Sequence, residues 1–210
     1  MNANNPNHQL GEYLRKRLQH LEQCIGEFNS HLEELERELD RNLHNGTVRR
    51  DDPEVGKINH HREYVVANTF RYTMLVGLCS FLEEAIKEIT KRLVSDYDAK
   101  IKAAKKGNWL VRHTRVLVDQ FGIDLGPIDE DLKKFHDLIT LRNCVVHAWG
   151  KVAGANNPSA VKDAVDRIET AEIFKDGFLC FGDQVLPEAI VAAENIADHI
   201  LESELKTSIT

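Results

Sequence analysis

The sequence predicts a mainly α-helical protein: a multi-helix bundle of long, up-and-down antiparallel helices with one small β-hairpin near the C-terminus. Composition favours helix, because aromatic residues make up 7% of the 210 residues, five are proline, and Leu, Glu, Lys and Ala are plentiful. Apolar residues recur at steps of three and four over long stretches. An Asp-Gly pair between two short apolar runs predicts the hairpin.

The first element expected is one long amphipathic helix within residues 1–50. Its apolar residues alternate steps of three and four, with dense charge between them: Leu10, Leu14, Leu18, Leu21, Ile25, Phe28, Leu32, Leu35, Leu39 and Leu43. A helix of that length spans about 50 Å, more than a compact domain needs. We therefore expect it to belong to the bundle and to pack against a partner helix, and Asn45-Gly46 to end it.

Residues 51–210 are expected to form the rest of the same single domain. Asp52-Pro53 can open a second helix, whose wide apolar face between Tyr64 and Leu93 predicts contacts with several elements. A basic connector and a short helix ending at Gly122 follow. The fourth helix is expected over 129–149, with Asp129 as its N-cap and Gly150 as its stop.

The C-terminal part is expected to be shorter elements and one last helix. Asn157-Pro158 predicts a short helix to about Glu169, and Asp176-Gly177 predicts the hairpin turn. Pro187 is expected to start the last helix.

Charge and motif content narrow the classes of function. The net charge of −7 argues against a surface that is basic all over, so any nucleic-acid site has to be local. The four cysteines are far apart, which favours free buried thiols over disulfides or a zinc site.

The start of the chain lacks an apolar signal core and no 18-residue apolar run occurs, so we expect a cytoplasmic protein with no membrane contact. No motif indicates nucleotide hydrolysis, serine hydrolysis or zinc proteolysis.

The stretch LRNCVVHAWG, residues 141–150, carries the candidate chemistry. Arg142 occupies a position in the apolar stripe of the fourth helix, whereas Asn143 and His147 share a second, polar face. A buried unpaired guanidinium is costly, so Arg142 either pairs with an acid or faces a groove that an anion can enter. In the first case Glu83 or Glu84 forms a structural salt bridge with Arg142, and His147 simply suits the helix C-terminus.

In the second case the three residues can cleave a phosphodiester without a metal or cofactor. A histidine can take the proton of a ribose 2′-hydroxyl, an arginine can hold the phosphate, and an asparagine can orient either group. Arg142, Asn143 and His147 are therefore the candidate catalytic residues, with Glu83 and Glu84 as supporting acids.

The arrangement resembles the Rx4-6H motif of HEPN domains: Arg142, a polar residue, His147 five positions on, and Gly150 after the helix. The order of helices, hairpin and last helix over roughly residues 55–205 is similar to that of longer bacterial HEPN proteins. The resemblance implies a homodimer whose two motifs face one cleft, and metal-independent cleavage of RNA in toxin–antitoxin, phage-defence or RNA-processing systems. Trp149 departs from toxin members paired with a nucleotidyltransferase antitoxin, which often have tyrosine there.

A basic segment before and within the third helix offers an RNA contact. Its expected RNA-binding residues are Lys102, Lys105, Lys106, Arg112 and Arg115. The alternative for this segment is a solvated connector and helix start. For the whole chain, the alternative function is a non-catalytic HEPN-like module that binds RNA or a protein partner and keeps Arg142 and His147 for structure.

Overall fold

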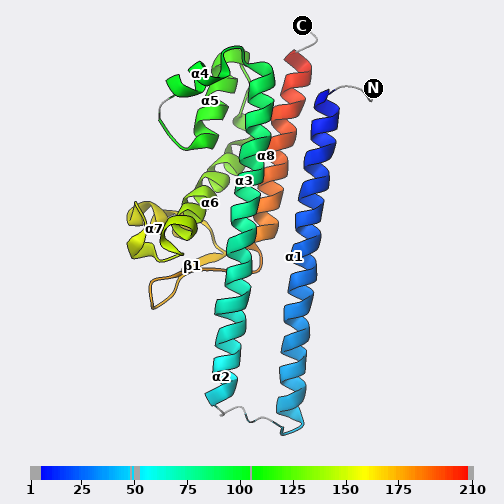
Figure 1. The fold of residues 1–210 in the computed structure, drawn as a ribbon, viewed down its shortest axis with the longest axis vertical. Coiled ribbons are helices and arrows are strands. Elements are labelled where there is room, and N and C mark those ends of the chain that lie inside the picture. Colours follow the sequence, from blue (N-terminus) through cyan, green and yellow to red (C-terminus); the bar gives the residue numbers. More distant parts are fainter. Residues whose placement is uncertain (1–5, 48, 50–52, 105, 208–210) are drawn as a thin grey trace.

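The computed structural model describes residues 6–47, 49, 53–104 and 106–207, and three long helices dominate it (Figure 1). They are α1 (Pro6–His44), α3 (Asn68–Leu93) and α8 (Val185–Thr207), and α8 packs against both others. The predicted fold class is confirmed: the protein is mainly α-helical, with a two-stranded antiparallel sheet near the C-terminus.

The core lies where these three helices meet. Leu14 and Leu18 of α1, Leu75 of α3 and Ile196 of α8 are each at most 3% exposed. Because α1 places an apolar residue at every third or fourth position, its row of leucines stays on the side that faces α8. Burial of such side chains supplies most of the stability of the body of the molecule.

α1 continues past the beginning of α8, so its second half has no third helix beside it (Figure 1). α2 (Pro53–His60) and the π-helix η1 (His61–Ala67) run alongside this extension and lead into α3. Residues 28–44 of α1 together with α2 and η1 are called the arm below. Phe28 stacks on Phe70 at the base of the arm, with ring centroids 3.7 Å apart.

Two short helices cover the opposite end of α3 (Figure 1). α4 (Tyr97–Ala103) forms in a segment that we expected to be a connector, so that part of the sequence prediction was wrong. α5 (Trp109–Phe121) ends at Gly122, which has a positive φ of 63°, as expected. The side chain of Asn108 caps its start by accepting from the amide of Val111.

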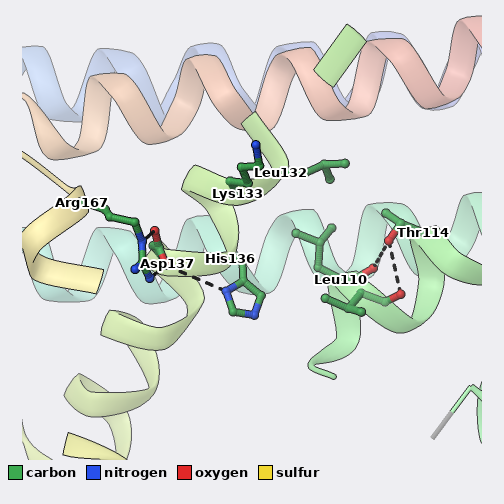
Figure 2. Close-up of a pocket in the computed structure, with 8 residues that line it drawn as sticks. Leu110, Thr114, Leu132, Lys133, His136, Asp137 and Arg167 are labelled. Atoms are coloured by element: carbon green, nitrogen blue, oxygen red, sulfur yellow. Dashed lines mark hydrogen bonds and ion pairs between the residues drawn. The ribbon is translucent and has the colours of Figure 1, made fainter. Parts of the chain in front are cut away.

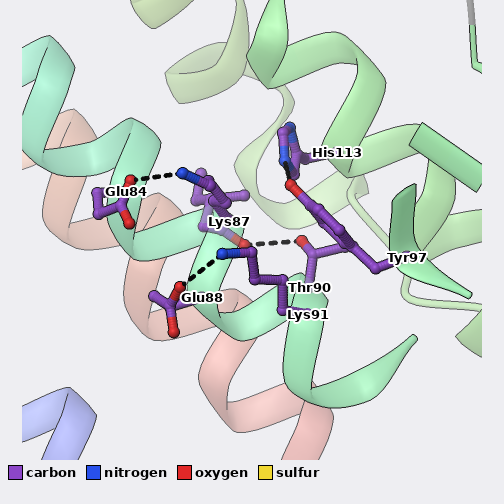
Figure 3. Close-up of polar contacts among 8 residues, drawn as sticks. Glu84, Lys87, Glu88, Thr90, Lys91, Tyr97 and His113 are labelled. Carbon is purple, nitrogen blue, oxygen red and sulfur yellow. Dashed lines mark hydrogen bonds and ion pairs between the residues drawn. The ribbon is translucent and has the colours of Figure 1, made fainter. Parts of the chain in front are cut away.

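His113 of α5 forms a hydrogen bond with Tyr97 of α4 (Figure 3). Its Nδ1 lies 2.7 Å from the carbonyl oxygen of Trp109, and its Nε2 lies 2.8 Å from the hydroxyl of Tyr97. A carbonyl can only accept, so Nδ1 carries the proton and the Tyr97 hydroxyl donates to Nε2. Burial lowers the pKa of His113 below its ordinary value.

A single 3-10 turn, η2 (Gly126–Ile128), precedes α6 (Asp129–Ala148), which crosses the body of the molecule. We expected Asp129 to cap this helix, but it is the first helical residue, and Ile128 precedes it without a side-chain cap. The three acids of the first turn suit the positive end of the helix dipole instead.

The remaining elements follow the sequence prediction closely. η3 (Val152–Gly154) leads into α7 (Pro158–Arg167), capped by the side chain of Asn157, which accepts from the amide of Ala160. β1 (Ala171–Ile173) pairs with β2 (Leu179–Phe181), and Asp176-Gly177 lies in the turn between them. α8 begins at Val185, two residues before the proline expected to start it.

Two predictions about the chain's chemistry need adjustment. Cys79, Cys144 and Cys180 are free and buried as expected, but Cys24 is exposed.

One helical stretch in the described part of the chain, Tyr64–Leu93, is long and apolar enough by composition to cross a membrane. Ten residues of α3 are buried against the rest of the fold, which fits the central helix of a soluble protein, while a cytoplasmic location stays a prediction.

Candidate functional site

The last two turns of α6 place Asn143 and His147 in one hollow of about 280 Å³. Thr140 and Cys144 complete the wall on the α6 side. His147 is exposed and Asn143 is half-buried, so a ligand that enters from solvent can reach both side chains. The spacing of three and four residues puts them on one line along the helix.

The opposite wall of this hollow is the beginning of α7. Asn156, Asn157, Ala160 and Val161 line it there. The start of α7 carries the partial positive charge of a helix N-terminus, which favours negative charge, although Pro158 has no N–H and the amides of Ala160 and Val161 already donate to Asn157. The sequence predicted a helix start at Asn157-Pro158, but nothing in it indicated that this start faces His147.

Arg142 lies beside the hollow rather than in it. Its Nη1 donates to Asn143 Oδ1 at 3.0 Å, and its buried Nε has no hydrogen-bond partner. Within the part of the chain that the structure describes, Arg142 forms no ion pair with Glu83 or Glu84, and Glu84 pairs with Lys87 at 3.0 Å. The salt bridge that would make Arg142 purely structural is therefore not formed.

The hydrogen bond from Arg142 decides what Asn143 can do. The amide oxygen of Asn143 accepts from the guanidinium, which leaves its NH2 group to donate elsewhere. Asn143 thus links a guanidinium charge to a hollow that it lines with a hydrogen-bond donor. Such a pair of groups suits an anionic ligand.

The two thiols near the motif are poor nucleophiles. Burial raises the pKa of Cys79 to about 12, although the charge of Arg142 opposes this rise. Burial also raises the pKa of Cys144, which lines the hollow. Both thiols stay protonated at neutral pH, and the reactive thiolate form is not available.

The end of α6 is fixed in place by backbone contacts. Trp149 and Gly150 have positive φ values of 54° and 79°, and Gly150 is packed so closely on Tyr72 that a Cβ there would collide with the hydroxyl. The amide of Leu179 donates to the carbonyl of Gly150 at 2.9 Å, and the Tyr72 hydroxyl donates to the carbonyl of Leu179 at 2.6 Å. α3 and β2 together therefore hold the turn that follows His147.

Trp149 is 86% exposed, the largest exposed fraction among the exposed large hydrophobic side chains of the described residues. Its backbone is in the left-handed region, which costs a residue with a side chain roughly 1–2 kcal/mol. This backbone conformation ends α6, because the amide of Trp149 donates to the carbonyl of Cys144. The turn leaves a large aromatic side chain open to solvent two residues after His147.

The predicted RNA-binding residues lie away from the motif. Lys102 and Lys106 are exposed on and after α4, Arg115 is exposed on α5, and Arg112 is half-buried with its Nε buried and unpartnered. Lys105 lies outside the described residues.

α5 meets α6 where Trp109 contacts Phe135 edge-on. Phe135 precedes His147 by twelve residues, or about 18 Å along a helix. The structure thus brings Asn143 and His147 together, with Arg142 beside them, and leaves Glu83, Glu84 and the basic segment separate from their hollow.

A larger hollow of about 430 Å³ lies nearer the start of α6 (Figure 2). Arg167 makes two hydrogen bonds to the buried Asp137, at 2.7 and 2.8 Å, and His136 Nδ1 lies 4.0 Å from the same carboxylate. Lys133 is paired with the acids of the first turn. The cations that line this hollow are therefore already balanced by carboxylates, and sequence analysis did not identify the pair between Asp137 and Arg167.

Comparison with known proteins adds no relative. No protein-family model matches the chain, and no curated protein or solved structure matches it.

Proposed function

We propose that the chain is a metal-independent endoribonuclease of HEPN type that leaves a 2′,3′-cyclic phosphate and a 5′-hydroxyl. The observation that carries this proposal is the hollow that Asn143 and His147 share with the start of α7, beside an Arg142 that no acid neutralises within the described residues. A phosphate in this hollow would meet a donor from Asn143, the positive end of α7 and the field of Arg142.

The chemistry requires one proton transfer in each direction. His147 takes the proton of the ribose 2′-hydroxyl, whose oxygen then attacks the adjacent phosphorus. The bond from phosphorus to the 5′-oxygen breaks, and that oxygen takes up a proton from solvent water as it leaves. Arg142, held through Asn143, stabilises the charge that develops on the phosphate oxygens.

Trp149 gives the proposed site a surface for a base. Bases of single-stranded RNA stack on exposed aromatic side chains, each contributing roughly 1–3 kcal/mol. Trp149 follows His147 by two residues but does not line the hollow, so we assign it to a base that flanks the nucleotide being cleaved. Lys102, Lys106 and Arg115 belong to α4, α5 and the segment between them, and α5 meets α6 at Phe135, about 18 Å along the helix from His147. We therefore assign them to a more distant part of the strand.

The biological setting that the resemblance suggests is a toxin–antitoxin or phage-defence system. In this setting the chain acts as a homodimer and an antitoxin or other protein partner restrains it. Overexpression in bacteria tests the setting: arrested growth with the wild-type chain and normal growth with His147→Ala are expected.

Cleavage of total RNA in the presence of EDTA tests the activity. His147→Ala and Arg142→Ala should each lower the rate by about 100-fold or more, and Asn143→Ala by about tenfold, the value of one orienting hydrogen bond. His136→Ala is the matched control, because His136 is also exposed on α6 but lines the other hollow. A His147→Ala protein with unchanged cleavage would end the ribonuclease proposal.

Asn143→Asp separates a phosphate site from a structural one. The new carboxylate would accept from Arg142 just as the amide oxygen does, so the fold should keep its melting temperature. It would also neutralise the guanidinium and remove the NH2 donor, so cleavage should fall further than in Asn143→Ala. Equal activity of the two variants would show that the charge of Arg142 is not used.

The second candidate function is a non-catalytic module that binds RNA through the same surface. The strained and exposed Trp149 favours this candidate, because a stacking residue is useful without any cleavage. If RNA binds and Trp149→Ala weakens that binding while no variant changes RNA integrity, the chain is a binding module.

A further inference from the structure

We infer that a second hollow, between η1, α3 and the hairpin turn, binds a small organic cation that carries a quaternary ammonium group. This hollow is separate from the one that His147 lines, so the inference is independent of RNA cleavage. It measures about 290 Å³, close to the lower end of the range for small-molecule pockets, which is roughly 300–1,000 Å³. The ligand is therefore a molecule of few heavy atoms.

Aromatic rings form much of the wall of this hollow. Tyr64 of η1, Tyr72 of α3, and Phe174 and Phe178 of the hairpin turn all line it. Tyr64 and Phe174 meet at nearly a right angle, with ring centroids 4.2 Å apart and ring planes 85° apart. The face of an aromatic ring attracts a cation, and aromatic walls of this kind suit a quaternary ammonium group.

Asp176 is the one charged residue among the described residues that line this hollow. Its Oδ1 accepts from the amide of Phe178 at 3.3 Å, and it forms no ion pair within the part of the chain that the structure describes. Burial raises the pKa of Tyr72 to about 12, and the charge of Asp176 acts in the same direction, so this phenol stays neutral. The hollow therefore has one negative charge at neutral pH, which favours a cation and disfavours RNA phosphate.

The buried polar groups beside the hollow already bond to one another. Asn68 donates to the carbonyl of Leu179 at 2.9 Å and accepts from the amide of Phe181 at 3.1 Å. The hydroxyl of Tyr72 donates to the same carbonyl of Leu179 at 2.6 Å. Few acceptors are left for a ligand, so the hollow suits a quaternary ammonium group, which has no N–H donor, better than a primary ammonium or a guanidinium.

Backbone hydrogen bonds hold the hairpin side of the hollow in place. The amide of Phe174 donates to the carbonyl of Phe178 at 2.8 Å, and the amide of Gly177 donates to the carbonyl of Phe174 at 2.8 Å. The amide of Val152 donates to the carbonyl of Gly177 at 3.0 Å, which ties the turn to η3. Lys151 does not line the hollow, but its Nζ lies over the Phe178 ring, 5.8 Å from the centroid. A site that is already ordered loses less conformational freedom when a ligand binds.

Titration of the full chain with choline chloride at constant ionic strength tests the inference, with the backbone amide resonances of residues 176–178 as the reporter. A dissociation constant on the order of 1 mM is expected for a cation on aromatic rings at a partly exposed site. The matched probe is dimethylbutanol, which has the shape of choline with a neutral carbon in place of the nitrogen. It should bind at least about tenfold more weakly, because it has no charge for the carboxylate and the rings to attract.

Two variants assign the binding to the carboxylate and to the rings. Asp176→Asn should raise the dissociation constant of choline about tenfold, while the Asn-Gly pair that it creates still favours the hairpin turn. Phe178→Leu should also raise it about tenfold, because leucine keeps an apolar surface without an aromatic face. Asp183→Asn is the matched control, since Asp183 is exposed after β2 and does not line the hollow.

Several outcomes overturn the inference: no shift of the reporter resonances at about 50 mM choline, equal binding of choline and dimethylbutanol, unchanged binding in Asp176→Asn, or equal loss in Asp183→Asn. Binding to phosphatidylcholine vesicles without binding to choline also overturns it, because the ligand would then be a membrane surface. The comparison of choline with dimethylbutanol uses the wild-type chain, so it decides the matter even if a variant fails to fold. RNA cleavage is read separately with His147→Ala.

Discussion

The two halves of α1 have the same sequence pattern and different surroundings. Leu14, Leu18 and Ile25 in the first half are at most 5% exposed, because α8 covers them. Leu35 in the second half is 38% exposed, although it continues the same row of apolar residues. The periodicity of a helix therefore determines which face is apolar, but not whether the same chain supplies something to cover it.

The difference shows which part of α1 contributes to the stability of the core and which part leaves apolar side chains exposed. In the body, leucine side chains are buried among three helices and contribute to folding. In the arm, the same residue type stays partly exposed and contributes less to folding. Four predictions, ordered from the largest expected effect to the smallest, test this comparison.

The largest effect is expected from a cavity in the body. Leu18 is 2% exposed, so Leu18→Ala should lower the free energy of unfolding by about 2–5 kcal/mol. Urea unfolding followed by circular dichroism measures it. A loss below about 1 kcal/mol would mean that the contact of α1 with α8 is loose, and the contrast between the two halves would disappear.

The second effect concerns the turn after His147. Gly150→Ala should lower the free energy of unfolding by about 1–2 kcal/mol for the left-handed backbone, and by more for the collision with Tyr72. Gly177→Ala is the matched control, because its φ of 83° is similar but no atom lies within 4 Å of the added Cβ. Equal losses in the two variants would contradict the close packing of Gly150 on Tyr72.

The third effect depends on pH and belongs to the body. Burial lowers the pKa of His113 below its ordinary value of 6.5, and Arg112 and Lys87 act in the same direction, while the bond to Trp109 and the charge of Glu83 oppose it. The unfolded chain therefore takes up this proton at higher pH than the folded chain does. The contribution to stability is complete above about pH 6.5 and declines as the pH falls through 6.5 toward the folded pKa.

Unfolding titrations between pH 8 and pH 5 check this prediction. The slope that His113 adds cannot exceed about 1.4 kcal/mol per pH unit, and His113→Gln should remove it. Ile58→Glu, a change confined to the arm, should keep it. A slope that stays the same in His113→Gln would assign the pH dependence to other groups.

The smallest effect is expected in the arm itself. Leu35→Ala should lower the free energy of unfolding by less than about 1 kcal/mol, since Leu35 is 38% exposed and loses few contacts. The same unfolding assay as for Leu18→Ala measures it. A cost equal to that of Leu18→Ala would show that the arm is as well packed as the body.

Most of the fold was predictable from sequence, because helix starts, helix ends and turns each depend on a few neighbouring residues. Asn157-Pro158 predicted the start of α7, Asp176-Gly177 predicted the hairpin turn, and Gly122 predicted the end of α5. α4 was not predicted, since its seven residues are too few to repeat an apolar pattern and none of its side chains is fully buried.

The candidate site was predictable only on one of its two sides. The spacing of Asn143 and His147 along α6 indicated a shared polar face from sequence alone. The wall that faces them comes from α7, and its position depends on how the chain turns back after Gly150. Likewise, the pair between Asp137 and Arg167 joins residues 30 apart, and no local pattern predicts such a contact.

The π-helix η1 determines how α2 is oriented relative to α3. A π-helix makes its hydrogen bonds one residue further along than an α-helix, so it accommodates a residue that a regular helix would not. Deleting one residue between His61 and Ala67 would restore a continuous α-helix from Pro53 to Leu93. Such a deletion would turn α2 by about 100° relative to α3 and move Ile58 away from Leu35 and Leu39, with which it lines one hollow of about 520 Å³. One residue more or fewer within η1 is therefore enough to set which side of α2 faces α1.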